Sequence, residues 1–165
     1  MIAIDKNRIK KILSERNLIA TMKRVMSNSS VQKVIIETIK SRLYNEGVDS
    51  WDEKLKTDFG RSQGTSSGYS RKTEQKKRAN KVTLFDTGEM FDSIFAKVKQ
   101  EALFVDADFD KGKSNIFDNF QDMYYSESLM KERIFGLSES DFEAVKREIL
   151  LKSFEDDLRG QLKNM

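Results

Sequence analysis

The stretch that decides the fold is VTLFDTGEMFDSIFAKVKQEALFVDAD, residues 82–108. It opens with Val82 to Phe85, whose β-branched and apolar side chains predict a short extended segment. Asp86-Thr87-Gly88 marks a turn, because glycine lets the backbone bend sharply. Asp86 or Thr87 can accept hydrogen bonds from the free N–H groups in the first turn of a helix. A short helix is therefore predicted from Glu89 to Ser93, and the structural motif comprises Asp86, Thr87, Gly88 and Ser93.

Two strand-like runs complete this stretch and predict a β-hairpin. They cover residues 94–99 and 102–108, and only Gln100-Glu101 separates them. A connection this short joins antiparallel strands. Three apolar side chains are placed to pack under the resulting sheet: Met90, Phe91 and Ile94.

Apolar residues at helical spacing predict N-terminal helices within residues 1–47. The first segment begins at an N-cap, Asp5, and forms either one helix or two helices with a break near Asn17. Asn28-Ser29-Ser30 ends it and caps the next helix, for which Gly47 is a suitable C-terminal stop. The later helix carries an apolar stripe: Val31, Val34, Ile35, Thr38, Ile39, Arg42 and Leu43. Two isolated anchors follow it, Trp51 and Leu55.

The segment 57–81 is different in composition and is predicted to be a long, polar, flexible loop. Glycines recur at 60, 64 and 68 among Ser, Thr and Gln residues. A basic run follows, in which Arg71, Lys72, Lys76, Lys77, Arg78 and Lys81 stand against a single Glu74. Such a run is either a solvated, mobile loop, an arm that docks on an acidic neighbour, or a surface that faces DNA. A DNA contact of this kind would be electrostatic and independent of sequence.

Downstream of the hairpin, a turn at 110–113 leads into an aromatic-rich, partly helical connection at 116–125. Ser138 and Asp141 resemble a capping box, and apolar residues at helical spacing then continue to Leu162. The prediction is an α+β fold, with a small antiparallel sheet packed with N-terminal helices and a long C-terminal helix. A length of 165 residues suits a single domain, 1–165. Its parts are the helices in 1–47, the loop 57–81 and the core and terminal helix in 82–165.

Three missing residue types narrow the chemistry. The chain has no Cys, which excludes disulfides and thiolate nucleophiles, and no His, which removes the commonest general base and metal ligand. It also has no Pro, so no proline-punctuated linker separates modules. No apolar run approaches the roughly 18 residues of a membrane span, and charge occurs within the first five residues. We expect no enzymatic activity, no cofactor, no metal, and synthesis in the cytoplasm without a membrane role.

Charge is distributed unevenly along the chain. Residues 1–100 carry 21 Lys/Arg and 12 Asp/Glu, a net charge of +9, whereas residues 101–165 carry 9 and 15, a net charge of −6. One interpretation is chance asymmetry on a solvated surface. The other is a pair of complementary faces that meet head to tail in a ring, because such contacts need two different patches.

Two acidic patterns resemble a calcium-binding loop and a nuclease carboxylate cluster, and both have simpler explanations. Asp106, Asp108 and Asp110 precede Gly112, but glycine falls seventh rather than sixth for a calcium loop, and strand alternation explains the spacing. Asp86, Glu89 and Asp92 share one helix face, where a solvated surface is favoured over a nuclease cluster. The glycine-rich segment lacks the Gly-Lys-Ser/Thr ending of a phosphate-binding loop.

Residues 82–93 resemble the L-x-D-T-G-x-L/M-x-x-S signature of phage virion morphogenesis and tail-completion proteins. Ile134-Phe135-Gly136-Leu137-Ser138 is similar to the F-L-G-L-S element of the same family, and Trp51 with Tyr69-x-x-x-Thr73-x-x-x-Lys77 lies upstream in the expected order. The likeness covers about residues 30–160 and is nearest to versions in crAss-like phages. The family often has a His, Gln or Gly element after the hairpin, and 116–130 contains no match to it.

This resemblance implies a structural virion protein of the head–tail junction, assembled in the bacterial host cytoplasm. The implied partners are further copies of the chain in a ring, the portal, and adjacent neck or tail proteins, with possible non-specific contact with DNA in the channel. Twelve-fold symmetry is favoured over six-fold, because a neck matched to the portal needs no change of symmetry. The alternative function is a basic DNA-binding or packaging accessory protein.

Overall fold

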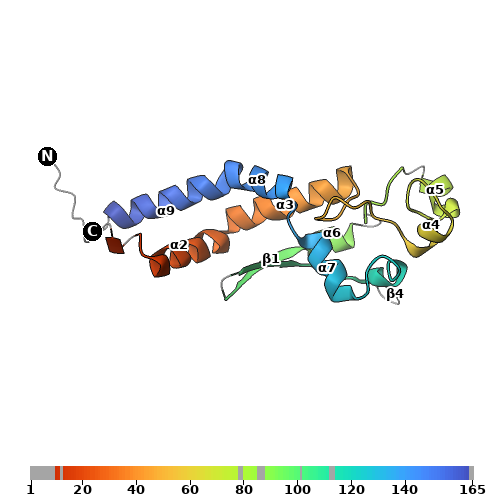
Figure 1. Ribbon diagram of the computed structural model, residues 1–165, viewed down its shortest axis with the longest axis horizontal. Helices are drawn as coiled ribbons and strands as arrows, with labels where there is room; N and C mark the ends of the chain where they lie inside the picture. Colours follow the sequence, from red (N-terminus) through yellow and green to blue (C-terminus); the bar gives the residue numbers. More distant parts are fainter. Residues whose placement is uncertain are drawn as a thin grey trace. The chain divides into compact units, whose positions relative to one another are not determined.

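A computed structural model describes residues 10–11, 13–77, 80–84, 88–100, 102–111 and 114–163. These residues form a mostly helical α+β fold with small antiparallel hairpins and a long C-terminal helix, as the sequence predicts (Figure 1). Contacts group the chain into two compact units. Unit 1 comprises Met1–Ile35, Ala96–Phe104 and Glu143–Met165, and unit 2 comprises Ile36–Phe95 and Val105–Phe142.

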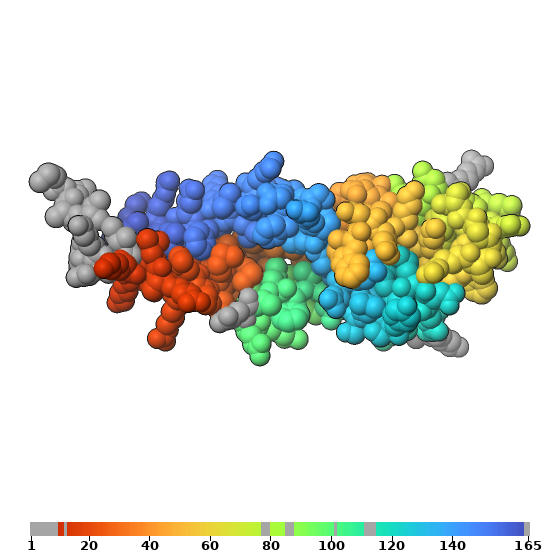
Figure 2. Space-filling model, in the orientation of Figure 1, coloured from red at the N-terminus to blue at the C-terminus, as the bar shows by residue number. Residues whose placement is uncertain are grey.

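Two antiparallel helices, α2 (Glu15–Ser27) and α9 (Leu151–Lys163), form much of unit 1 and lie against each other (Figures 1 and 2). Hydrogen bonds link the two helices. Arg24 donates to both oxygens of Asp157, at 3.1 and 2.8 Å, and Gln161 bonds both Asn17 and Thr21 at 2.9 Å. The hydrogen bond from Arg24 lowers the pKa of the Asp157 carboxyl. The predicted N-cap Asp5 lies outside the described residues, and α2 begins two residues before the predicted break at Asn17.

Helix α3 (Ser29–Asn45) begins and ends where the sequence predicts. Asn28 separates it from α2, and its side chain accepts a hydrogen bond from the Ser30 N–H at 2.9 Å. The predicted stripe is buried at Val31, Ile35, Ile39, Arg42 and Leu43. Gly47 follows the helix at φ +67°, and its N–H bonds the Arg42 carbonyl at 3.1 Å. A Cβ there would lie 2.5 Å from the Val82 carbonyl oxygen, so only glycine fits this stop.

The predicted hairpin and short helix are both present. Strands β1 (Phe95–Lys99) and β2 (Ala102–Asp106) pair with each other, and α6 (Glu89–Ser93) precedes them. Gly88, at φ +90°, occupies the N-cap position of α6, whereas Asp86 and Thr87 lie outside the described residues. The Ser93 hydroxyl donates to the Met90 carbonyl at 2.8 Å and accepts from the Asp108 N–H at 3.0 Å, which links α6 to the chain beyond β2.

The core of unit 2 contains the apolar residues around α6 and α7 (Glu127–Phe135). Met90, Phe91 and Ile94 are buried as predicted. A second hairpin, β3 (Asp110–Lys111) with β4 (Ser114–Asn115), pairs Asp110 with Asn115 and leads into a 3₁₀ turn, Ile116–Asn119. Buried aromatic and aliphatic side chains complete this core: Phe109, Ile116, Phe120, Tyr124, Met130, Ile134 and Phe135.

The prediction of a flexible loop over 57–81 is wrong for the described part of that segment. It contains α4 (Asp58–Ser62) and α5 (Arg71–Lys77), and Gly60, Ser67 and Gly68 are buried. A Cβ on Gly60 would lie 1.9 Å from the Gly68 carbonyl oxygen. The recurring glycines therefore let two backbone segments pack closely, and they do not indicate disorder.

The C-terminal helical region begins with the predicted capping box. The Ser138 hydroxyl accepts from the Asp141 N–H at 3.2 Å, and an Asp141 carboxylate oxygen accepts from the Ser138 N–H at 3.3 Å. Helix α8 (Glu139–Val145) continues through a π-helical turn, Lys146–Leu150, into α9. The predicted apolar stripe is buried only at Val145, whereas Phe142 and Leu162 are about half exposed.

Candidate functional site

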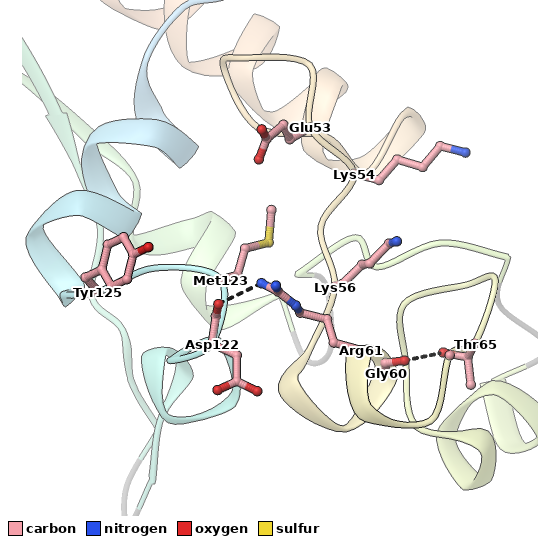
Figure 3. Close-up of a pocket in the computed structure, with 10 residues that line it drawn as sticks. Glu53, Lys54, Lys56, Gly60, Arg61, Thr65, Asp122, Met123 and Tyr125 are labelled. Carbon is pink, nitrogen blue, oxygen red and sulfur yellow. Dashed lines mark hydrogen bonds between the residues drawn. The ribbon is translucent and has the colours of Figure 1, made fainter.

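Among the described residues, a cleft of about 700 Å³ in unit 2 is a candidate binding site (Figure 3). Three chain segments line it. They are the extended segment 53–56, residues 60–65 in and after α4, and the segment 122–125, which follows the 3₁₀ turn. The side chains and backbone that line it belong to Glu53, Lys54, Lys56, Gly60, Arg61, Gly64, Thr65, Asp122, Met123 and Tyr125.

Two lysines enter the cleft from a short extended segment. A turn with Asp52 at φ +61° precedes this segment, and Val48 pairs with Lys54 as an isolated antiparallel bridge. Successive side chains of an extended chain point to opposite faces. Lys54 and Lys56 therefore extend to the same side, while Leu55 between them is buried (Figure 3).

Helix α4 places the third cation, Arg61, and is fixed at both ends. The Thr57 hydroxyl accepts from the Gly60 N–H at 3.0 Å, which caps the helix. The Asp58 carboxylate accepts from the backbone N–H groups of Gln121 and Asp122, at 3.1 and 2.9 Å. Arg61 Nη1 donates to the Asp122 carbonyl oxygen at 2.7 Å. The guanidinium group is thus positioned beside Asp122 and Met123 (Figure 3), and its other N–H groups have no partner among the described residues.

The electrostatics of the cleft favour an acidic ligand group at the lysines. Within the described part of the chain, no carboxylate forms an ion pair with Lys54 or Lys56. The Glu53 carboxylate is already paired with Arg133 Nη2 at 3.0 Å. Tyr125, whose side chain is 96% exposed, and the half-buried Met123 add apolar surface. The cleft therefore offers two ammonium groups that have no carboxylate partner among the described residues, and the exposed ring of Tyr125 lies on its opposite side (Figure 3).

A buried charge network supports the cleft. Asp49 is fully buried, and its carboxylate accepts from the backbone N–H groups of Trp51 and Glu53, at 2.9 and 3.1 Å, and from the Tyr124 hydroxyl at 3.1 Å. Its Oδ2 lies 2.5 Å from Arg133 Nη2. Burial raises the pKa of Tyr124 above its usual range, and Asp49 raises it further.

The Arg133 guanidinium carbon lies 4.2 Å from the centre of the Trp51 ring. Trp51 thus stacks on Arg133 at the surface, where it is 69% exposed, so this predicted isolated anchor is not buried. Leu55 is buried as predicted.

The described members of the basic run lie on two different segments. Arg71, Lys72 and Lys76 are exposed on α5, and Arg71 bonds Gln63. The side chain of Lys77 and the whole of Arg78 lie outside the described residues. Lys81 donates to the Asn45 carbonyl at the end of α3, so its positive charge stabilises the C-terminus of that helix.

The acidic patterns singled out from the sequence have local partners. Asp106 Oδ1 lies 3.3 Å from Lys131 Nζ, Asp108 accepts from the Asp110 N–H at 2.9 Å, and Asp110 accepts from Asn115 at 2.9 Å. The described residues contain no group of three acidic side chains placed to hold a metal ion. Of the other acidic set, Asp86 lies outside the described residues.

Sequence reasoning missed the three cations of the cleft. One signal was present, because Lys54 and Lys56 alternate around the apolar Leu55 in an extended stretch. Arg61 gave no such signal, since its position depends on contacts between residues about sixty positions apart in the chain.

No protein-family model, curated protein or solved structure matches this chain. Across the described residues, the helices are too short or too polar to cross a membrane.

Proposed function

We propose that this chain is a structural subunit of the head–tail junction of a tailed phage, a neck-ring or tail-completion protein. In this role it assembles into a ring and joins the portal to the tail. The proposal assigns the chain an adhesive function and no catalysis. The motif at 82–93 and the Ile134–Ser138 element suggest the family, and the surface of the molecule supports assembly.

The observation that carries the proposal is the exposure of α9. No side chain of this helix is buried, and Leu151 and Leu162 are 51% and 54% exposed. A helix of a globular protein normally buries an apolar stripe. The β1–β2 hairpin adds Phe95 and Phe104, about half exposed on a sheet of only two strands. Exposed apolar side chains gathered on thin elements mark surfaces that a neighbouring subunit covers.

The test is the mass of the purified chain, alone and with the portal protein, combined with negative-stain imaging. We expect a ring, or a complex that forms only on the portal. Twelve copies are expected on the twelve-fold portal, because matched symmetry lets every subunit make the same contact. A stable monomer that binds no portal or neck protein would overturn the proposal.

The exposed cations of α5 favour one alternative, a basic DNA-binding or packaging accessory protein. Arg71, Lys72 and Lys76 lie on a single helix and could contact phosphates. Such binding weakens steeply with salt, and the slope falls as cations are removed. Filter binding of duplex DNA at several salt concentrations, with the triple alanine variant as control, distinguishes this alternative from ring assembly.

A further inference from the structure

The outward face of α9 combines apolar and acidic side chains. Glu155 is four residues and Leu162 eleven residues after Leu151, so all three lie on one side of the helix. Glu148, in the π-helical turn, precedes Leu151 by three residues and is exposed. The ion pair of Glu155 with Arg159 is long, at 3.7 Å, and both side chains are mostly exposed. This face therefore presents leucines beside two accessible carboxylates.

The cleft of unit 2 has the complementary chemistry. Lys54 and Lys56 supply two ammonium groups without carboxylate partners among the described residues, and Met123 and Tyr125 supply the apolar surface. A volume of about 700 Å³ accommodates a few side chains from a helix that lies across the opening. The outward face of α9 and the cleft therefore complement each other in both charge and apolar surface.

We propose that the outward face of α9 of one copy docks on the cleft of a second copy. Glu148 and Glu155 face Lys54 and Lys56, and Leu151 packs on Met123 and Tyr125. The inference rests on the proposed function, because it names the contact by which the ring forms. The two surfaces differ, so the contact is heterologous, and repetition around an axis closes a ring.

The mixed charge of the cleft favours a protein occupant over a nucleic acid. Glu53 and Asp122 line the same cleft as the lysines. Their carboxylates oppose a continuous row of phosphates, whereas a protein surface can offer groups of both signs. Lys152, exposed beside Leu151, can supply such a positive group.

A charge exchange on the full-length chain tests the contact. One variant carries Lys54→Glu and Lys56→Glu, and the other carries Glu148→Lys and Glu155→Lys. Each alone brings like charges together, so we expect its self-association in analytical ultracentrifugation to weaken at least tenfold. In an equimolar mixture, the reversed cleft of the first variant can bind the reversed helix of the second. The unchanged cleft of the second can bind the unchanged helix of the first. We therefore expect the mixture to regain the oligomer.

Lys72→Glu with Lys76→Glu is the matched control, because it makes the same charge change on exposed lysines of α5. It should self-associate like the wild type. Circular dichroism and urea unfolding establish that every variant is folded, and a labelled single-stranded oligonucleotide tests the competing ligand.

Three results obtained with the variants would overturn the contact. They are variants that assemble like the wild type, a mixture that stays dissociated, or loss of oligonucleotide binding without any change in self-association. A wild-type chain that is monomeric at millimolar concentration overturns it as well. Binding of the wild type to the portal, measured separately, decides the proposed function: if the portal is bound, only the α9–cleft contact fails.

Discussion

At the scale of single residues, unit 2 is organised by buried charges with fixed partners. The Arg42 side chain is 2% exposed and donates to the Ile134 carbonyl at 2.6 Å and the Gly136 carbonyl at 2.9 Å, while Asp141 neutralises it. Arg42 thus joins α3 to the end of α7 and the start of α8. Its position in the apolar stripe of α3 was predictable from helical spacing. Its partners, more than ninety residues away, were not, because sequence spacing carries no information on long-range contacts.

We expect Asp49→Asn to destabilise unit 2 by about 3 kcal/mol, because removal of one member of a buried ion pair leaves the other charge uncompensated. Asp49 is fully buried and lies 2.5 Å from Arg133. Urea unfolding, followed by fluorescence of Trp51, the one tryptophan of the chain, measures the loss. Glu53→Gln is the control: this carboxylate is 60% exposed, and we expect a loss below about 1 kcal/mol. Equal losses of stability in the two variants would mean that burial of the Asp49–Arg133 ion pair does not contribute to the effect.

Tyr124 predicts a loss of stability in alkali. Burial and Asp49 raise the pKa of Tyr124 in the folded chain, whereas an unfolded tyrosine titrates near 10. Below that pH both states are protonated and the contribution is complete. Above it only the unfolded state loses the proton, so stability falls by about 1.4 kcal/mol per pH unit. Urea midpoints from pH 9 to 11, compared with those of Tyr124→Phe, isolate the effect. The same slope in both proteins would contradict it.

At the scale of elements, local signals predicted what local contacts determine. The hairpin, the short helix α6, the Asn28 cap and the Ser138–Asp141 capping box depend on residues within a few positions of one another. The prediction of a flexible loop failed for segment 57–77 because the order of this segment depends on distant contacts. Its order comes from Gly60 packed on Gly68 and from Asp58 bonded to residues 121 and 122, which composition cannot reveal. The cleft depends on the same distant contacts.

The capping box gives a prediction for α8. Ser138→Ala removes the acceptor for the Asp141 N–H, and we expect a loss of about 1 kcal/mol in the free energy of unfolding. Ser140→Ala is matched to it, because Ser140 is exposed within the first turn and caps no backbone group in the described contacts. That variant should change stability by only a few tenths of a kcal/mol. The comparison fails if the two variants lose the same amount in urea unfolding.

The glycines of the 57–68 segment give a second prediction at this scale. Gly60→Ala places a Cβ 1.9 Å from a backbone oxygen, so we expect a loss of about 3 kcal/mol and faster hydrogen exchange over 57–77. Gly64→Ala meets no atom within 4 Å, and its cost comes only from φ +61°, about 1 kcal/mol. Neutral behaviour of both variants would restore the flexible-loop interpretation of this segment.

At the scale of the whole molecule, the two units differ in the contacts that stabilise each of them. Met130 and Ile134 of α7 in unit 2 are completely buried, whereas α9 in unit 1 buries no side chain and meets α2 through polar groups. Local opening requires less free energy where few apolar contacts are lost. In the isolated chain we therefore expect amides of 151–163 to exchange at least about tenfold faster than those of 127–135, a gap of about 1.4 kcal/mol. Exchange followed by mass spectrometry on these two peptides measures it. If a neighbouring copy covers α9, as proposed, assembly should close the gap, and equal protection in the isolated chain would show that α9 needs no neighbour.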